Sequence, residues 1–126
     1  MSVEAVTILQ AITAKFIQAI SLIQNMIDAP EDENLYISAS LRLQLTRTDI
    51  EKSMRLLANE ERISHQPVPF VPLLNAQLSL DTCLENLRNN VTTEKREDDF
   101  ITLKSDVDVM KKIISQFSKN VPKDEY

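Results

Sequence analysis

The chain of 126 residues contains no glycine, and this feature removes most of the folds open to a chain of its length. Average usage would give roughly nine glycines. Glycine supplies the positive-φ positions of tight hairpin turns and lets a backbone approach a phosphate closely. Its absence excludes the Walker loop, the dinucleotide-binding fingerprint and the nucleophile elbow. Long helices with few connections can do without glycine, so the sequence predicts an all-α protein.

The first predicted helix, residues 2–28, carries more apolar surface than the surface helix of a bundle needs. Its heptad seam consists of Ala5, Leu9, Ile12, Phe16, Ala19, Ile23 and Met26. Flanking isoleucines, Ile8, Ile17, Ile20 and Ile27, widen this face. We expect this helix to be either the central helix of the domain or one that contacts a second chain.

The second predicted helix, residues 33–62, follows Pro30 and an acidic run, which suits the positive end of a helix dipole. Its seam comprises Tyr36, Ala39, Leu43, Thr46, Ile50, Met54 and Leu57. Within residues 38–48, Leu41, Leu43 and Leu45 alternate with polar residues, as in a half-buried strand. Helix is favoured because no second strand exists to pair with this stretch. Leu41 and Leu45 then form a second apolar ridge beside the seam.

Two further helices are predicted, at residues 72–91 and 97–120. Pro72 suits the first turn of the third helix because proline lacks an N–H group. Phe100, Leu103, Val107, Met110, Ile114, Phe117 and Val121 form the most regular seam, on the fourth. The polar run 92–99 is predicted to be mainly a loop, and the alternative is an exposed turn that joins the third and fourth helices almost continuously. Residues 121–126 are predicted to be a flexible tail. The expected fold is one domain, residues 1–126: an elongated antiparallel four-helix bundle of two long αα-hairpins.

A proline-rich linker, residues 63–71, joins the two predicted hairpins. With Pro72 it holds three of the five prolines and the single histidine, His65. We expect an extended crossover that runs along the bundle and covers the end of the core. The alternative is a recognition segment, since Pro69 and Pro72 fit the P-x-x-P spacing of polyproline ligands.

No catalytic, cofactor-binding or metal-binding motif is present in the sequence. One histidine and one cysteine, Cys83, cannot supply a four-ligand zinc site or the paired Glu-x-x-His motifs of a di-iron bundle. Cys83 follows Leu80 by three residues, so it is predicted to be a buried core thiol. We therefore expect no cofactor, no metal and no enzyme activity.

Charge and cysteine usage bear on partners and location. The net charge of −5, with both signs mixed along the chain, predicts no attraction to nucleic acid. The N-terminal stretch has no basic region typical of a signal peptide, and polar residues interrupt its apolar run, so we expect no membrane span. A lone cysteine fits an intracellular location, cytoplasmic or nuclear.

The leading functional hypothesis is a non-enzymatic structural or adaptor subunit that assembles with partner proteins through amphipathic helices, as a homo- or hetero-oligomer. A peptide-binding or secretion-type chaperone bundle and a small all-α enzyme with a bundle-interior site are the alternatives. Candidate partner contacts are Ile8, Phe16, Ile20, Ile27, Leu41, Leu45, Phe70 and Val71.

Overall fold

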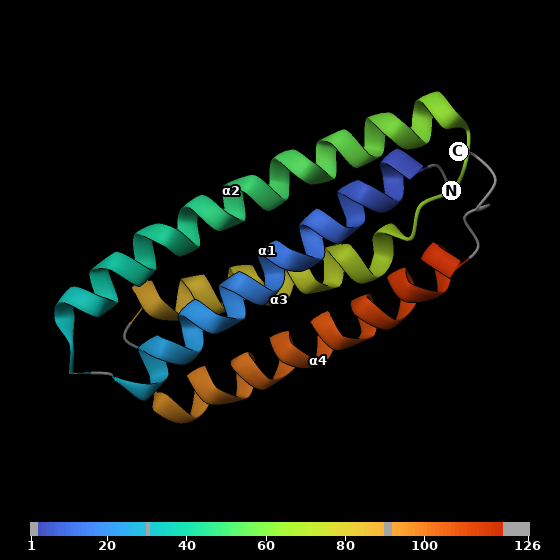
Figure 1. Ribbon diagram of the computed structural model, residues 1–126. Coiled ribbons are helices and arrows are strands. Elements are labelled where there is room, and N and C mark those ends of the chain that lie inside the picture. Colours follow the sequence, from blue (N-terminus) through green and yellow to red (C-terminus); the bar gives the residue numbers. More distant parts are fainter. Residues whose placement is uncertain (1–2, 30, 90–91, 120–126) are drawn as a thin grey trace.

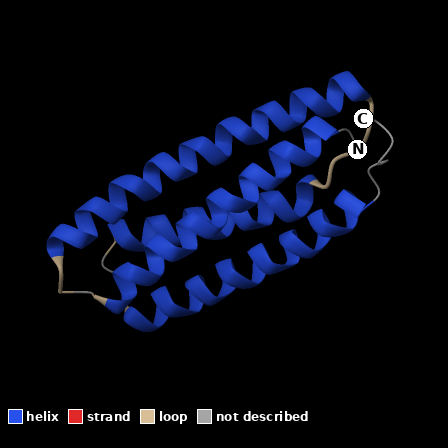
Figure 2. Ribbon diagram, in the orientation of Figure 1, coloured by secondary structure: helices blue, strands red, loops and turns tan. Residues whose placement is uncertain are grey.

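The computed structural model describes residues 3–29, 31–89 and 92–119, with the side chains of 117–119 excepted. This part of the chain forms α1 (Val3–Asp28), α2 (Glu33–Ser64), α3 (Phe70–Arg88) and α4 (Thr93–Lys119). Figure 2 shows the helices and their short connections, and the described residues include no strand. The predicted all-α class is confirmed, and residues 38–48 lie inside α2.

Successive helices run in opposite directions along one long axis (Figure 1). α1 packs against both α2 and α4, and α3 packs against α4. The connections within the α1–α2 and α3–α4 hairpins lie together at one end of the bundle, here called the hairpin end (Figure 1). The connection between α2 and α3 lies at the opposite end. This is the predicted elongated antiparallel bundle of two αα-hairpins.

One hydrophobic core runs through the bundle, and the predicted seams form it. Every seam residue predicted for α1 is buried, and the α4 seam is buried from Phe100 to Ile114. The side chains of Phe117 and Val121, also predicted for this seam, lie outside the described part of the chain. α1 packs on two neighbours, as α4 also does, and Ile17 of its predicted wide apolar face is exposed, so both predicted roles of this helix stay predictions.

The start of α4 differs from the prediction, because the helix begins at Thr93 and not at 97. The Thr92 hydroxyl oxygen accepts a hydrogen bond from the Lys95 amide (3.2 Å), which satisfies one free N–H group of the first turn. Lys95 also pairs with Asp99 one turn later (3.0 Å). The Thr92 cap and the Lys95–Asp99 pair thus stabilise a helical turn in a stretch that has no apolar periodicity.

The other boundaries shift by a few residues. α2 extends to Ser64 instead of 62, and α3 begins at Phe70 instead of 72, so the linker shortens from 63–71 to 65–69. α3 ends at Arg88, and residues 90–91 of the predicted range lie outside the described part of the chain. Pro72 lies in the first turn of α3, as predicted. The linker does not run along the bundle, since it joins two adjacent helix ends (Figure 1). Residue 120 and the predicted tail, 121–126, lie outside the described residues.

His65 ends α2 in the left-handed conformation (φ 58°, ψ 24°), and among the described residues only it has a positive φ. Its amide donates to the Glu61 carbonyl oxygen (2.9 Å). The Glu61 carboxylate in turn accepts a hydrogen bond from the Val68 amide (2.7 Å), and Val68 and Phe70 pack against the core. The histidine thus takes the left-handed position after the helix that, where it occurs, is usually glycine.

Candidate protein-interaction surface and hairpin-end cavity

The residues predicted as partner contacts differ in their accessibility. Phe16 is fully buried in the core, so a partner cannot reach it in this fold, and it is removed from the candidates. Four others are half-buried and pack against the core, namely Ile8, Ile20, Ile27 and Phe70. The remaining three, Leu41, Leu45 and Val71, are exposed.

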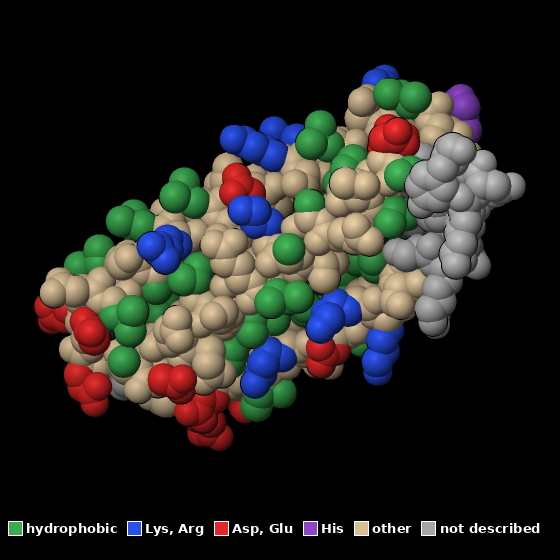
Figure 3. All heavy atoms as spheres, viewed as in Figure 1, with side chains coloured by type: hydrophobic (Ala, Val, Ile, Leu, Met, Phe, Trp, Pro, Cys, Tyr) green, Lys and Arg blue, Asp and Glu red, His purple; other side chains and the backbone are tan. Residues whose placement is uncertain are grey.

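An apolar stripe follows the side of α2 that faces away from the bundle, and we call it the outer face of α2. It consists of Ile37, Leu41, Leu45, Leu56 and Ile63, which are 58–66 % exposed. Five of the twelve large apolar side chains exposed among the described residues are in this stripe. Figure 3 shows hydrophobic side chains along the outer edge of α2, most densely towards the hairpin end.

The outer face lies opposite the face of α2 that builds the core. Leu41 and Leu45 are each two residues from the fully buried Leu43, which corresponds to about 200° around a helix. This corrects the expectation that Leu41 and Leu45 form a ridge beside the seam. The alternation of leucine with polar residues reflects a helix with two apolar faces, and the sequence reading missed Ile37, Leu56 and Ile63 as members of the second.

Two basic side chains accompany this stripe. Lys52 lies in line between Leu45 and Leu56, Arg42 lies at its flank, and both are exposed. Neither side chain takes part in the ion pairs found among the described residues. The nearby carboxylates are already paired, because Asp49 contacts Lys15 and Glu51 contacts Arg47 and Arg55. The outer face is therefore apolar with unpaired positive charge.

Polar side chains hold α2 to α3. The Arg47 guanidinium donates through Nε and Nη2 to the two carboxylate oxygens of Asp81, and it also contacts Glu51 (3.2 Å). The bond to Asp81 raises the pKa of Arg47 above its ordinary value. Closer to the hairpin end, the Tyr36 hydroxyl donates to the Leu87 carbonyl oxygen (2.5 Å). These contacts fix the orientation of α2, so its outer face stays turned away from the core.

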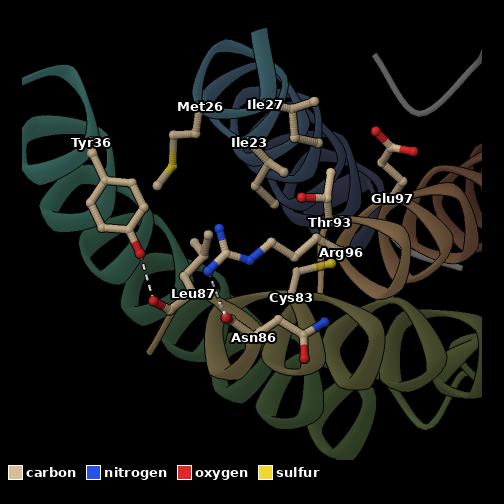
Figure 4. A pocket seen from close by; sticks show the side chains of 10 residues that line it. All are labelled: Ile23, Met26, Ile27, Tyr36, Cys83, Asn86, Leu87, Thr93, Arg96 and Glu97. Atoms are coloured by element: carbon tan, nitrogen blue, oxygen red, sulfur yellow. Dashed lines mark hydrogen bonds between the residues drawn. The ribbon is translucent and has the colours of Figure 1, made fainter. Parts of the chain in front are cut away.

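A cavity of about 160 Å³ lies at the hairpin end. Its lining is mainly apolar and comes from all four helices (Figure 4). The lining residues are Ile23, Met26 and Ile27 of α1, Tyr36 of α2, Cys83, Asn86 and Leu87 of α3, and Thr93, Arg96 and Glu97 of α4. The sequence reading did not find this cavity, because its residues belong to four separate segments and share no periodicity.

Arg96 brings a positive charge into this mainly apolar space. Its side chain reaches from α4 into the middle of the lining residues, whereas the Glu97 carboxylate points away from it (Figure 4). Nη2 of Arg96 donates to the Asn86 carbonyl oxygen (3.4 Å). Its Nε is buried and has no hydrogen-bond partner in the described part of the chain. Since a guanidinium remains protonated in proteins, the cavity holds an unsatisfied, charged donor.

The carboxylate of Asp99, beside the cavity, binds Asn86 and Lys95 and does not pair with Arg96. It accepts hydrogen bonds from the buried Asn86 side-chain amide (2.5 Å) and from Lys95 (3.0 Å). These bonds, that of Asn86 first, lower the pKa of Asp99. No ion pair involving Arg96 is found among the described residues.

Cys83 and His65, the two residues that the sequence analysis weighed for catalysis and metal binding, lie apart in the fold. Burial raises the pKa of the Cys83 thiol to about 12, so the thiol is neutral near pH 7 and is a poor nucleophile. His65 lies at the linker end of α2, away from the hairpin-end cavity that Cys83 lines. The described residues include no group of three or more His, Cys, Asp or Glu side chains placed to hold a metal ion.

α1 is the one described helix that is long and apolar enough to cross a membrane. Length and composition alone are weak evidence for a span, because the central helix of a bundle meets the same criteria. Here the seam of α1 from Ala5 to Met26 is buried in the bundle core. The absence of a membrane span stays a prediction.

Comparisons with known proteins add no functional assignment: no family model, curated protein or solved structure matches this chain.

Proposed function

We propose that this protein is a non-enzymatic assembly subunit that docks an amphipathic helix of a partner protein on the outer face of α2. The observation that carries the proposal is the second apolar face of this helix. A helix in a single-chain bundle needs one apolar stripe to bury against its neighbours. The core face of α2 already fulfils this requirement. Exposed apolar side chains that follow one another along a surface are typical of protein-interaction sites.

The number of apolar side chains matters for the free energy of docking. Association costs about 4–15 kcal/mol in lost rotational and translational freedom. Burying one leucine or isoleucine completely contributes about 1.5–3 kcal/mol. One or two exposed residues therefore cannot offset this cost, whereas the five residues of the outer face, together with the apolar side chains of the partner helix, contribute an amount in the same range.

The positive charge of the outer face indicates which kind of partner helix fits it. The unpaired cations Arg42 and Lys52 favour a helix with acidic residues beside its apolar stripe. A second copy of this chain is a poorer fit. A two-fold axis near residue 47 would place Arg42 of one copy against Lys52 of the other, and like charges in an interface are destabilising. The proposed complex is therefore a hetero-oligomer.

Site-specific photo-crosslinking in the native host tests the proposal. A benzophenone amino acid replaces Leu45 in one variant and the exposed Val109 of α4 in a matched control. We expect crosslinks from position 45, and not from position 109, to a defined amphipathic segment with acidic residues. A synthetic peptide of that segment should then bind the purified chain.

Three outcomes would contradict the proposal. These are equal crosslinking from positions 45 and 109, crosslinks from position 45 to a second copy of this chain, and crosslinks from position 45 to lipid alone.

A further inference from the structure

We propose that the hairpin-end cavity binds a small apolar carboxylate, whose hydrocarbon part fills the space between the helices and whose carboxylate pairs with Arg96. This site is distinct from the outer face of α2, because its lining residues come from the inner sides and ends of all four helices. The inference therefore does not depend on the proposed assembly function.

The volume of the cavity limits the size of the ligand. An apolar protein cavity of about 150 Å³ is large enough to bind benzene. The hairpin-end cavity, at about 160 Å³, therefore accommodates a single ring or a branched chain of similar size. Ile23, Met26 and Leu87 supply apolar walls on different sides of this space (Figure 4).

The charge in the cavity determines the polar group of the ligand. Arg96 is half-buried and has no ion-pair partner among the described residues, and a carboxylate is the natural partner of a guanidinium. Nε of Arg96 is buried and unpartnered among the described residues, and adjacent Nη2 has only the long contact to the Asn86 carbonyl oxygen. The guanidinium that reaches into the cavity is a planar fork of donors, which binds a carboxylate through two parallel hydrogen bonds.

Water is a weaker partner for Arg96 than a carboxylate, because water is neutral and does not offset the charge of the guanidinium. Access from solvent is present, because Thr93 and Glu97 line the cavity and are themselves exposed.

Calorimetric titration of the full chain with benzoate at pH 7 tests the inference, with benzyl alcohol as the neutral probe of similar size. We expect Arg96→Gln to weaken benzoate binding by about tenfold or more, equivalent to 1.4 kcal/mol. Arg62→Gln removes the same charge from an exposed position of α2, away from the cavity, and should leave the affinity for benzoate unchanged. Benzyl alcohol should bind the wild type more weakly than benzoate does, and should not respond to Arg96→Gln.

A second variant keeps the test independent of the folding of Arg96→Gln. Ile27→Phe places a larger side chain at the cavity and should remove benzoate binding while the helical circular dichroism is retained. The inference is overturned if benzoate does not bind the wild type, if it binds Arg96→Gln equally well, or if Ile27→Phe leaves its affinity unchanged.

Discussion

His65 shows how a chain without glycine ends a long helix. Its left-handed conformation costs an ordinary residue about 1–2 kcal/mol, and glycine almost nothing. We expect His65→Gly to raise the free energy of unfolding and His65→Asn to leave it nearly unchanged. His65→Val should lower it by about 1–3 kcal/mol, because a β-branched residue is strained at positive φ. Urea denaturation measures all three, and equal stability of the valine and glycine variants would contradict this role.

Protonation of Asp99 should make the free energy of unfolding depend on pH. Its pKa in the folded protein is lowered below the ordinary value of 3.8 by the hydrogen bonds from Asn86 and Lys95. A lowered pKa stabilises the fold fully above pH 3.8 and loses this contribution as the pH falls through the folded value. We expect the stability difference between wild type and Asp99→Asn to be greatest near neutral pH and to shrink below pH 3.8. A difference that is constant from pH 7 to pH 2 would refute the assignment.

At the scale of the helix, the two faces of α2 should respond differently to the same substitution. Leu43→Ala removes a fully buried side chain and should lower the free energy of unfolding by about 2–5 kcal/mol. Leu45→Ala, two residues later, removes a side chain that is 66 % exposed and should change it by no more than about 0.5 kcal/mol. Thermal and urea unfolding measure both, and a large loss for Leu45→Ala would mean that the outer face serves the core of this chain.

Heptad spacing predicted most of the helices and their buried residues. Apolar residues at this spacing lie on one face of a helix, and that face is buried against the neighbouring helices. The spacing did not predict the beginning of α4, where Thr92 and the Lys95–Asp99 pair stabilise a turn without apolar residues. The spacing also did not show whether Leu41 and Leu45 lie beside the buried seam of α2 or on the opposite face of the helix. That distinction depends on which neighbours α2 has, and the neighbours become known only in three dimensions.

The candidate sites, too, could be predicted from the sequence only in part. Phe16 belonged to a wide apolar face, but the packing of α2 and α4 on α1 buries it completely. Arg96 lies in a polar stretch that predicts a solvated loop, and the helix that forms there turns its guanidinium into the cavity (Figure 4). Both outcomes are set by tertiary packing, which a single sequence does not specify.

In the molecule as a whole, the two sites occupy separate regions. The core face of α2, with α1, α3 and α4, completes a bundle, so the outer face of α2 is available without unfolding. The hairpin-end cavity lies within that bundle among all four helices. We therefore expect substitutions on the outer face to abolish assembly without altering benzoate binding, and Arg96→Gln to do the reverse. Titration and reconstitution with the crosslinked peptide measure the two properties, and loss of both in either variant would contradict this separation.

The central claim is that the outer face of α2 holds a partner protein, and the mass of the native complex tests it most directly. Size exclusion with light scattering is applied to the chain purified from its host at its natural level, as wild type and as the Leu41→Asp, Leu45→Asp double variant. We predict that the wild type elutes in a stoichiometric hetero-complex, and that the double variant elutes as a helical monomer of 14.4 kDa. A wild type that is itself a monomer, or a double variant that remains in the complex, would contradict the claim.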